Sequence, residues 1–243
     1  MIKSTLRSLA FASVFTAVCT NARDAQTLAL VEQTYLEAKA EYKTNSSSAA
    51  ADRKFASACF DEADNAANDK AREPFALEGI DVCQAWLQRE PTNGAAHYYL
   101  GMNLAQLART KTLGALSVVK QMEKEWLAAL NFDAGCDYAG ADRNLGLLYR
   151  DAPGFPISVG SKSKADEHLQ HAIQLAPEYP ENWINLIETH LKRKPSEVPD
   201  ELAKLKAILP AARKQFSGPQ WQSSWQDWDP RVKAIERKLA ESQ

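Results

Sequence analysis

Two arginines offer the sharpest chemistry in the sequence. Arg143 and Arg150 lie seven residues apart, so two turns of a helix would place both on one side. A pair of fixed guanidinium groups can clamp a carboxylate through paired hydrogen bonds. The acidic residues Asp142, Asp151 and Glu188 could instead neutralise the arginines in structural ion pairs. The spacing therefore predicts either an anion clamp or a structural ion network.

The four histidines give a weaker signal. His168 and His171 lie one helical turn apart, which is a spacing that can hold a divalent metal. No neighbouring Asp, Glu or Cys completes an obvious ligand set, so we expect a solvated helix face and no metal site. His97 and His190 fall at positions that recur along the chain, and we expect them to pack in the core.

Motifs of known catalytic chemistry are missing from the sequence. It contains no GxSxG, HExxH or GxxxxGK[ST] pattern and no CxxC pair. We therefore expect no enzyme activity and no cofactor. The formal net charge of -2 and the charged fraction of 25 % are ordinary for a globular chain and do not indicate a nucleic-acid partner.

The N-terminus has the layout of a secretory signal peptide. Lys3 and Arg7 precede an apolar run over 9–19, which is shorter than the roughly 20 residues that span a bilayer. We predict a signal peptide over 1–22 with cleavage before Arg23, and a periplasmic or secreted protein. Cys19 offers an alternative, because a lipid on this residue would attach the protein to a membrane.

Export changes the interpretation of the three remaining cysteines, Cys59, Cys83 and Cys136. An oxidising compartment would allow a disulfide, for which Cys59 and Cys83 across a helical hairpin are the best pair. The alternative is three buried thiols that act as small apolar side chains.

A repeated pattern of helix, break and new helix organises the middle of the chain. The breaks centre on Pro91, Ala134 and Pro177, at equal intervals of 43 residues. Gly101 and Gly146 follow a leucine in two of the restarting helices, and a small residue there lets two helices approach closely. At the third break, Pro177 ends one helix and Pro180 starts the next, so we interpret the break as a joint.

The unit His97, Leu100, Gly101 and Leu104 resembles the tetratricopeptide repeat, and the resemblance covers about 60–194. It implies an all-α array of helical hairpins stacked into a superhelix. The usual period is about 34 residues, and the excess here falls in 108–116 and 151–160, so we expect enlarged loops within the repeats.

A second, looser resemblance rests on the segments "GADRNLGLLY" and "KADEHLQHAIQLAPEYPENW", at 140–149 and 164–183. They look like the periplasmic tetratricopeptide-type T-component that accompanies TRAP-type solute transporters. That resemblance implies an accessory protein that interacts with a solute-binding protein.

The domain organisation follows from these segments. We predict N-terminal helices over 23–72, repeats with enlarged loops over 73–194, and a helical C-terminal cap over 195–243. The cap contains Trp221, Trp225 and Trp228, which would share one helix face. We expect them to cover the end of the last repeat, with a sugar or peptide platform as the alternative.

The first helix of each hairpin should line the concave face of the array. The predicted lining residues are Tyr98, Met102, Gln106, Arg143, Leu147, Arg150, Ile184, Glu188 and Leu191. We expect an exported, non-enzymatic scaffold that binds a protein or peptide partner on this face. The alternative is a transporter accessory protein that holds a small carboxylate or an amphipathic solute.

Overall fold

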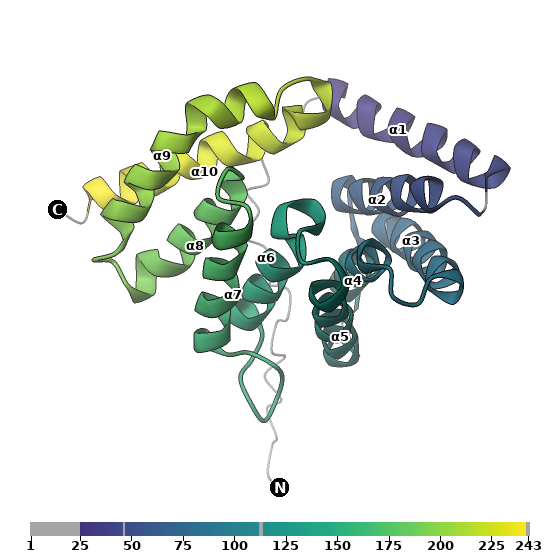
Figure 1. Ribbon diagram of the computed structural model, residues 1–243, viewed down its shortest axis with the longest axis horizontal. Helices are drawn as coiled ribbons and strands as arrows, with labels where there is room; N and C mark the ends of the chain where they lie inside the picture. The colour runs from purple at the N-terminus through teal and green to yellow at the C-terminus, as the bar shows by residue number, and fades with distance from the viewer. Residues whose placement is uncertain (1–24, 46, 112–113, 242–243) are drawn as a thin grey trace, which may run out of the picture.

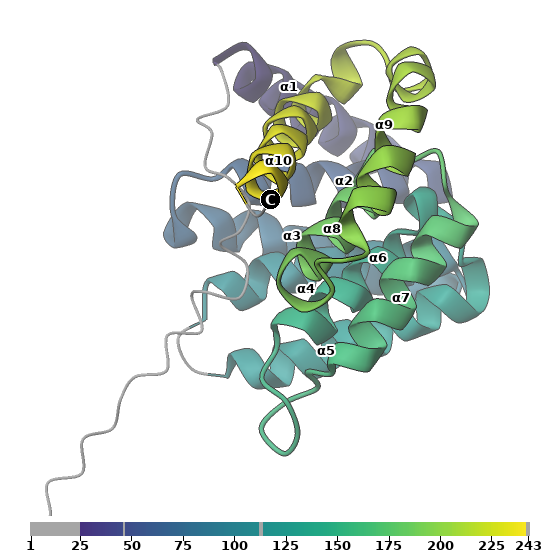
Figure 2. The same cartoon turned by 90° about the vertical axis from the view of Figure 1, so that its left-hand side faces the viewer.

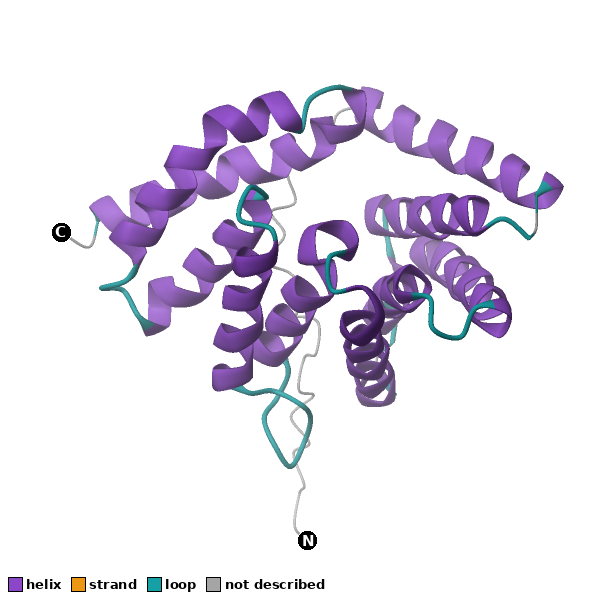
Figure 3. Ribbon diagram, in the orientation of Figure 1, coloured by secondary structure: helices purple, strands orange, loops and turns teal. Residues whose placement is uncertain are grey.

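The computed structural model describes residues 25–45, 47–111 and 114–241. In these ranges the chain is helical and contains no strand, which confirms the all-α prediction (Figure 3). The helices are α1 Ala25–Thr44, α2 Ala49–Asn65, α3 Asp69–Arg89, α4 Gly94–Arg109, α5 Ala115–Asp133, α6 Cys136–Asp151, α7 Lys162–Leu175, α8 Pro180–Arg193, α9 Val198–Gln215, the 3-10 helix η2 Pro219–Trp221, and α10 Gln222–Ala240.

The predicted signal peptide over 1–22 and the possible lipid site at Cys19 lie outside the described residues. Among the helices that are described, none combines the length and the apolar character that crossing a bilayer requires.

The helices form hairpins that stack side by side into a curved array (Figure 1). Helices α2, α4, α6 and α8 contact one another in series and form the inner wall. Each packs against the helix that follows it, α3, α5, α7 or α9. This arrangement confirms the predicted helical repeat array. α1 and α10 lie at its two ends.

The breaks between the helices lie at the predicted positions, at Pro91, Ala134 and Pro177. α3 ends at Arg89 and α4 begins at Gly94, and the Asn93 side chain caps α4 by accepting a hydrogen bond from the Ala96 amide at 3.0 Å. Pro180 is the first residue of α8, where its missing N–H breaks no helical hydrogen bond.

The glycines beside the leucines allow close helix packing, as expected. A Cβ atom on Gly101 would lie 2.3 Å from Nε1 of Trp126, and one on Gly146 would lie 2.6 Å from Cγ of Leu169. Both contacts are too close for any side chain atom. The Leu-Gly pairs therefore bring α4 against α5 and α6 against α7.

The start of α6 departs from the repeat pattern. Asp137, Tyr138 and Ala139 have φ values of 51°, 54° and 62°, so they form a left-handed turn before the right-handed helix. For residues other than glycine, this conformation costs about 1–2 kcal/mol each. The sequence predicted an ordinary helix restart here, and the turn needs tertiary contacts to hold it.

The segment predicted as a helical C-terminal cap, over 195–243, contains α9 from Val198 and α10 from Gln222. Trp228 is 1 % exposed and packs edge-on against Tyr179, with ring centroids 5.2 Å apart. The rings thus cover the last repeat.

The described cysteines are buried free thiols, so Cys59 and Cys83 form no disulfide. Burial raises the pKa of the Cys136 thiol to about 12 and also raises those of Cys59 and Cys83. They therefore act as small apolar side chains.

Candidate ligand cavity

A cavity of about 510 Å³ lies inside the curve of the array. Its wall comes from the inner helices α2, α4 and α6, the start of α8, and the end helices α1, η2 and α10. The lining residues are Thr27, Leu30, Val31, Thr34, Phe60, Asp61, Asp64, Asn65, Tyr98, Met102, Ala105, Gln106, Arg109, Asp137, Arg143, Asn144, Leu147, Tyr179, Glu181, Pro219, Gln220, Trp221, Ser223, Ser224, Asp227, Trp228 and Arg231.

The first and last described helices border this cavity. The start of α1 and the start of α10 meet along one side of the molecule (Figures 1 and 2), and the two helices run away from this point in opposite directions (Figure 1). The Thr27 hydroxyl on α1 donates to Oε1 of Gln226 on α10 at 3.5 Å, across 199 residues of sequence. The first and last described helices therefore contribute residues to one side of the cavity.

A polar hub centred on Asp137 forms one side of the cavity. Its carboxylate accepts hydrogen bonds from the Tyr98 hydroxyl and, at 2.8 Å, from Nη2 of Arg143. Arg143 also donates to Oδ1 of Asn182 at 3.1 Å and lies 3.8 Å from Oε2 of Glu181. The hub joins α4, α6 and α8.

The same arginine holds the left-handed turn. Nη1 of Arg143 donates to the carbonyl oxygens of Asp137 at 3.2 Å and Tyr138 at 3.1 Å. The amide of Asn182 donates to the Tyr138 carbonyl at 3.1 Å. Hydrogen bonds from a charged donor contribute about 1.5–3 kcal/mol each, which is comparable to the backbone cost of the turn.

Burial and charge fix the protonation of the hub. Burial opposes the charged form of Arg143, but the nearby Glu181, Tyr179, Tyr98 and Asp137 outweigh it and raise the pKa above its ordinary value. Burial, reinforced by Asp137, raises the pKa of Tyr98 well above its ordinary value. The guanidinium therefore stays charged and the phenol stays neutral near neutral pH.

Aromatic rings lie beside the hub. Tyr138 stacks on Tyr179 with ring centroids 4.7 Å apart and planes within 4°. Trp221 packs against Phe216 at 4.8 Å, and the Arg143 guanidinium lies 5.0 Å from the centre of the Tyr179 ring. Apolar rings and a charged hub thus face the same cavity.

Acidic side chains outnumber basic ones in the lining. The acids are Asp61, Asp64, Asp137, Glu181 and Asp227, and the bases are Arg109, Arg143 and Arg231. Each arginine already pairs with a carboxylate: Arg109 with Asp64, Arg143 with Asp137, and Arg231 with Asp227, each at 2.8 Å. This balance does not favour an anionic ligand.

The structure brings five of the predicted lining residues together in the cavity. They are Tyr98, Met102, Gln106, Arg143 and Leu147. Arg150 does not reach it, because its Nε and Nη2 atoms each bond a carboxylate oxygen of Asp151 at 2.7 Å. The two arginines therefore do not form the predicted clamp. Arg150 pairs with Asp151, as the ion-pair alternative expected, whereas Arg143 pairs with Asp137, which that alternative did not name.

The residues predicted on α8 lie elsewhere. Ile184 is fully buried in the core that α8 shares with α9 and α10, and Leu191 packs against that core. Glu188 bonds Arg231. The reason is that the C-terminal cap covers the α8 part of the concave wall, so the cavity ends near Glu181.

The histidines also have partners that the sequence did not reveal. Nδ1 of His168 and Nδ1 of His171 each lie 2.7 Å from an oxygen of Asp142, which is 1 % exposed. We expected the two histidines to lie on a solvated face, but Asp142 of α6 contacts both of them. His190 is fully buried, as expected for a core position, whereas His97 is half-buried and its Nδ1 lies 2.6 Å from Oε2 of Glu125.

Sequence reasoning missed several cavity residues. Asp137 lies in the first turn of α6 and Tyr179 directly before α8, at two breaks that we had interpreted only as connectors. Trp221 and Trp228 were expected to cover the last repeat, and they also line the cavity. The dense aromatic run over 218–230 was the one signal that pointed to them.

Comparison with known proteins gives no match: no protein-family model fits the chain, and no curated protein has a significantly similar sequence.

Proposed function

We propose that this chain is a non-enzymatic binding protein that holds a small amphipathic solute in the cavity bordered by α1, η2 and α10. The size of this cavity and its mixed apolar and charged lining support the proposal most directly. The cavity volume of about 510 Å³ falls within the roughly 300–1,000 Å³ typical of small-molecule sites. A space of that size does not admit a folded partner.

The lining indicates the chemical class of the solute. Tyr179, Trp221 and Trp228 offer ring faces and edges for an apolar or cyclic body. The excess of carboxylates over arginines favours polar groups that donate hydrogen bonds, or a positive charge. Of the two solute classes in our alternative interpretation, the amphipathic solute fits better than the small carboxylate.

The same lining favours binding over catalysis. None of its described residues is a histidine or a cysteine. Tyr98 and Arg143 both donate to Oδ2 of Asp137, so these bonds hold the three side chains in place. A raised pKa also makes the Tyr98 phenol a poor source of a nucleophilic phenolate near neutral pH.

Export and a role beside a transporter extend the proposal. Export is supported by the signal-peptide layout of 1–22, and the accessory role by the resemblance of 140–149 and 164–183 to the T-component of TRAP-type transporters. An accessory protein of that kind would hold or pass on the solute that its solute-binding protein carries.

The cavity can be tested by filling it. Ser224 lies on α10 and lines the cavity, so Ser224→Trp would occupy the space without removing a charge. Native mass spectrometry of the purified chain should detect a co-purifying small molecule, and calorimetric titration should then measure its binding. We expect Ser224→Trp to abolish both signals.

The matched control is Gln121→Trp, on the exposed surface of the outer helix α5. It should bind like the wild type. Equal solute binding by Ser224→Trp and Gln121→Trp, with both variants folded, would contradict a ligand site in this cavity.

A protein partner is the second candidate, and the loop between α6 and α7 supports it. The loop extends away from the helices (Figures 1 and 3), and its Phe155 and Ile157 are 92 % and 59 % exposed. Its base is held by the Gly160 amide, which donates to the Pro153 carbonyl at 2.9 Å. An exposed apolar tip on an anchored loop suits docking to another protein.

The expected partner class is a solute-binding protein. Affinity capture from periplasmic extract with the wild-type chain should enrich such a protein, and Phe155→Ser with Ile157→Ser should lose it. Ser224→Trp should retain it, because that change lies in the cavity. Equal capture by the loop variant would exclude the loop as the docking surface.

A further inference from the structure

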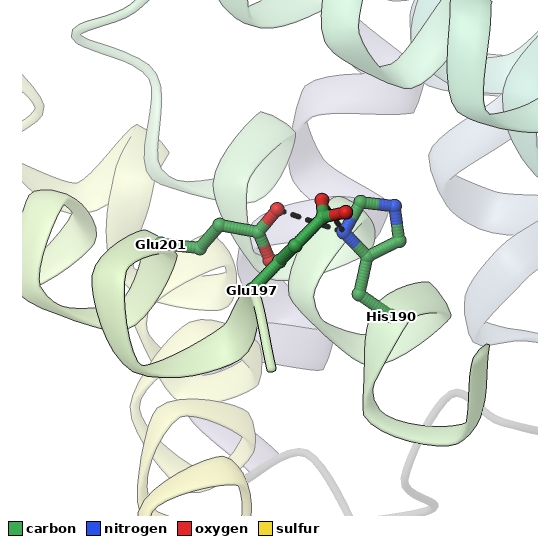
Figure 4. Close-up of side chains that lie close together, drawn as sticks. All are labelled: His190, Glu197 and Glu201. Atoms are coloured by element: carbon green, nitrogen blue, oxygen red, sulfur yellow. Dashed lines mark hydrogen bonds and ion pairs between the residues drawn. The ribbon is translucent and has the colours of Figure 1, made fainter. Parts of the chain in front are cut away.

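A cluster of potential metal ligands lies at the joint between α8 and α9, outside the cavity (Figure 4). His190 comes from the last turn of α8, Glu197 precedes the first residue of α9, and Glu201 lies in the first turn of α9. We call these three residues the α8–α9 cluster.

The ligand atoms are spaced as a metal site requires. One atom from each residue can be chosen so that all three lie within 4.8 Å of one another. Nδ1 of His190 is 3.6 Å from Oε2 of Glu197 and 2.7 Å from Oε1 of Glu201. Ligands about 2.1 Å from a tetrahedral zinc ion lie roughly 3.4 Å apart. A small rotation of Glu201 would therefore complete the geometry.

The cluster leaves buried polar atoms without partners. His190 is fully buried and Glu201 is 8 % exposed. Oε2 of Glu201 and Nε2 of His190 have no hydrogen-bond partner. Figure 4 shows the Glu201 carboxylate directed at the imidazole. A buried carboxylate oxygen without a donor is costly, and a bound cation would satisfy it.

The carboxylates around His190 outnumber the arginine and lysine side chains beside them. Asp166, Glu197 and Glu201 are the carboxylates around His190. Arg193 and Lys194 supply two positive charges, and both contact Asp166, at 2.8 Å and 3.2 Å. With a neutral imidazole, three carboxylates therefore face two cations.

We propose that His190, Glu197 and Glu201 bind one divalent transition-metal ion, with Zn²⁺ as the best fit to one imidazole and two carboxylates. The ion binds Nδ1 of His190, so the proton of the neutral imidazole is carried by Nε2. Nε2 then faces Oδ1 of Asp166, now 3.6 Å away. A carboxylate behind a metal-bound histidine is a common supporting contact. Water fills the fourth position beside Glu197, whose side chain is 48 % exposed.

The bound ion has a structural consequence. It links the end of the last inner helix to the start of the C-terminal cap, and the cap covers one side of the cavity. Metal binding to the native state alone raises the stability of that state. A protonated His190 paired with Glu201 is the competing explanation, and it needs no metal.

The test is calorimetric titration of the chelator-treated full chain with ZnCl₂ near neutral pH. We expect one equivalent of zinc to bind and the thermal midpoint to rise. Glu197→Gln keeps the shape of an accessible side chain, so it should fold normally and bind zinc at least about tenfold more weakly. Circular dichroism in chelator checks that its fold is unchanged.

His171→Asn is the matched control, because His168 and His171 form the other histidine pair. It should bind zinc like the wild type. Three outcomes would overturn the proposal: no stoichiometric binding by the wild type, unchanged affinity in Glu197→Gln, or loss of binding in His171→Asn. The first outcome would support the protonated-histidine explanation.

Discussion

Arg231 on α10 bonds Glu188 on α8 through two parallel hydrogen bonds, Nε to Oε1 at 2.9 Å and Nη2 to Oε2 at 2.7 Å. Arg231 is 9 % exposed, and its Nη1 also pairs with Asp227 at 2.8 Å. Burial alone would lower the pKa of Arg231, but Glu188 and Asp227 raise it above its ordinary value. This pair links α10 of the cap to α8, the last inner helix. Because Glu188 pairs with Arg231, it does not line the cavity.

Glu188→Gln should therefore destabilise the protein. It leaves the buried Arg231 with one carboxylate fewer, which we expect to lower the free energy of unfolding by about 2 kcal/mol. Urea denaturation measures the change. The control is Glu236→Gln, which breaks the exposed pair of Lys206 and Glu236 and should change stability by less than about 1 kcal/mol. Similar losses in the two variants would contradict a special role for the buried pair.

Gly101→Ala should destabilise the array although alanine is the better helix former. The gain in helix propensity is about 1 kcal/mol. The new Cβ would lie 2.3 Å from Nε1 of Trp126, whose ring is 1 % exposed and cannot move aside. Overpacking of this kind costs about 1–3 kcal/mol, so we expect a net loss in thermal and urea denaturation.

Gly135→Ala is the matched substitution. The nearest atom to a Cβ on Gly135 is Oδ1 of Asp133 at 3.8 Å, and its φ of -82° suits alanine. This variant should be as stable as the wild type. Equal stability of Gly101→Ala and Gly135→Ala would show that α4 and α5 do not depend on close approach.

Arg143→Lys should destabilise the hub although it preserves the charge. A lysine ammonium cannot reproduce the fork that bonds the Asp137 carboxylate and two carbonyl oxygens of the left-handed turn. We expect a loss of about 2–3 kcal/mol and faster amide exchange across 137–139. Arg109→Lys is the control, since Arg109 is more exposed and contacts Asp64 and Gln106 through one nitrogen. An unchanged exchange rate in Arg143→Lys would show that the turn does not need this arginine.

Stability should fall in alkaline solution because of two buried phenols. Burial, then Asp137, raises the pKa of Tyr99 to about 12; burial, then a hydrogen bond to Glu78, does the same for Tyr35. At pH values below 10.0, the pKa of tyrosine in the unfolded chain, both phenols are protonated in the folded and in the unfolded state. The stability that comes from their raised pKa values is therefore fully present there. As the pH rises from 10.0 to the folded-state pKa of about 12, the phenols lose their protons first in the unfolded chain. The stability that came from the raised pKa values is lost over this pH range.

Each phenol should reduce the free energy of unfolding by about 1.4 kcal/mol per pH unit across that window. Urea midpoints at a series of alkaline pH values give the slope. Tyr99→Phe should make the slope smaller, because it removes one of the titrating groups. If the free energy of unfolding of the wild type stays constant between pH 10.0 and about 12, the pKa values of Tyr35 and Tyr99 are not raised in the folded state.

The sequence predicted the hairpins because their signals are local. Proline cannot donate a helical hydrogen bond, so Pro177 and Pro180 placed a joint without any knowledge of the neighbours. Helical periodicity placed Tyr98, Met102 and Leu147 on the inner side, and the structure has them in one cavity. The same reasoning misplaced Ile184, because nothing in the repeat shows where the cap will cover the wall.

The sequence by itself determined which segments are helices, where they break and, for α4 and α6, which residues face the cavity, since these depend on residues within a few turns of one another. Only the tertiary structure decided that Thr27 contacts Gln226 and that Glu188 pairs with Arg231 and does not line the cavity. It also decided that Arg143 supports the left-handed turn at Asp137. These contacts depend on the curvature of the whole array, which sums small rotations between successive hairpins and leaves no pattern in a short stretch of sequence.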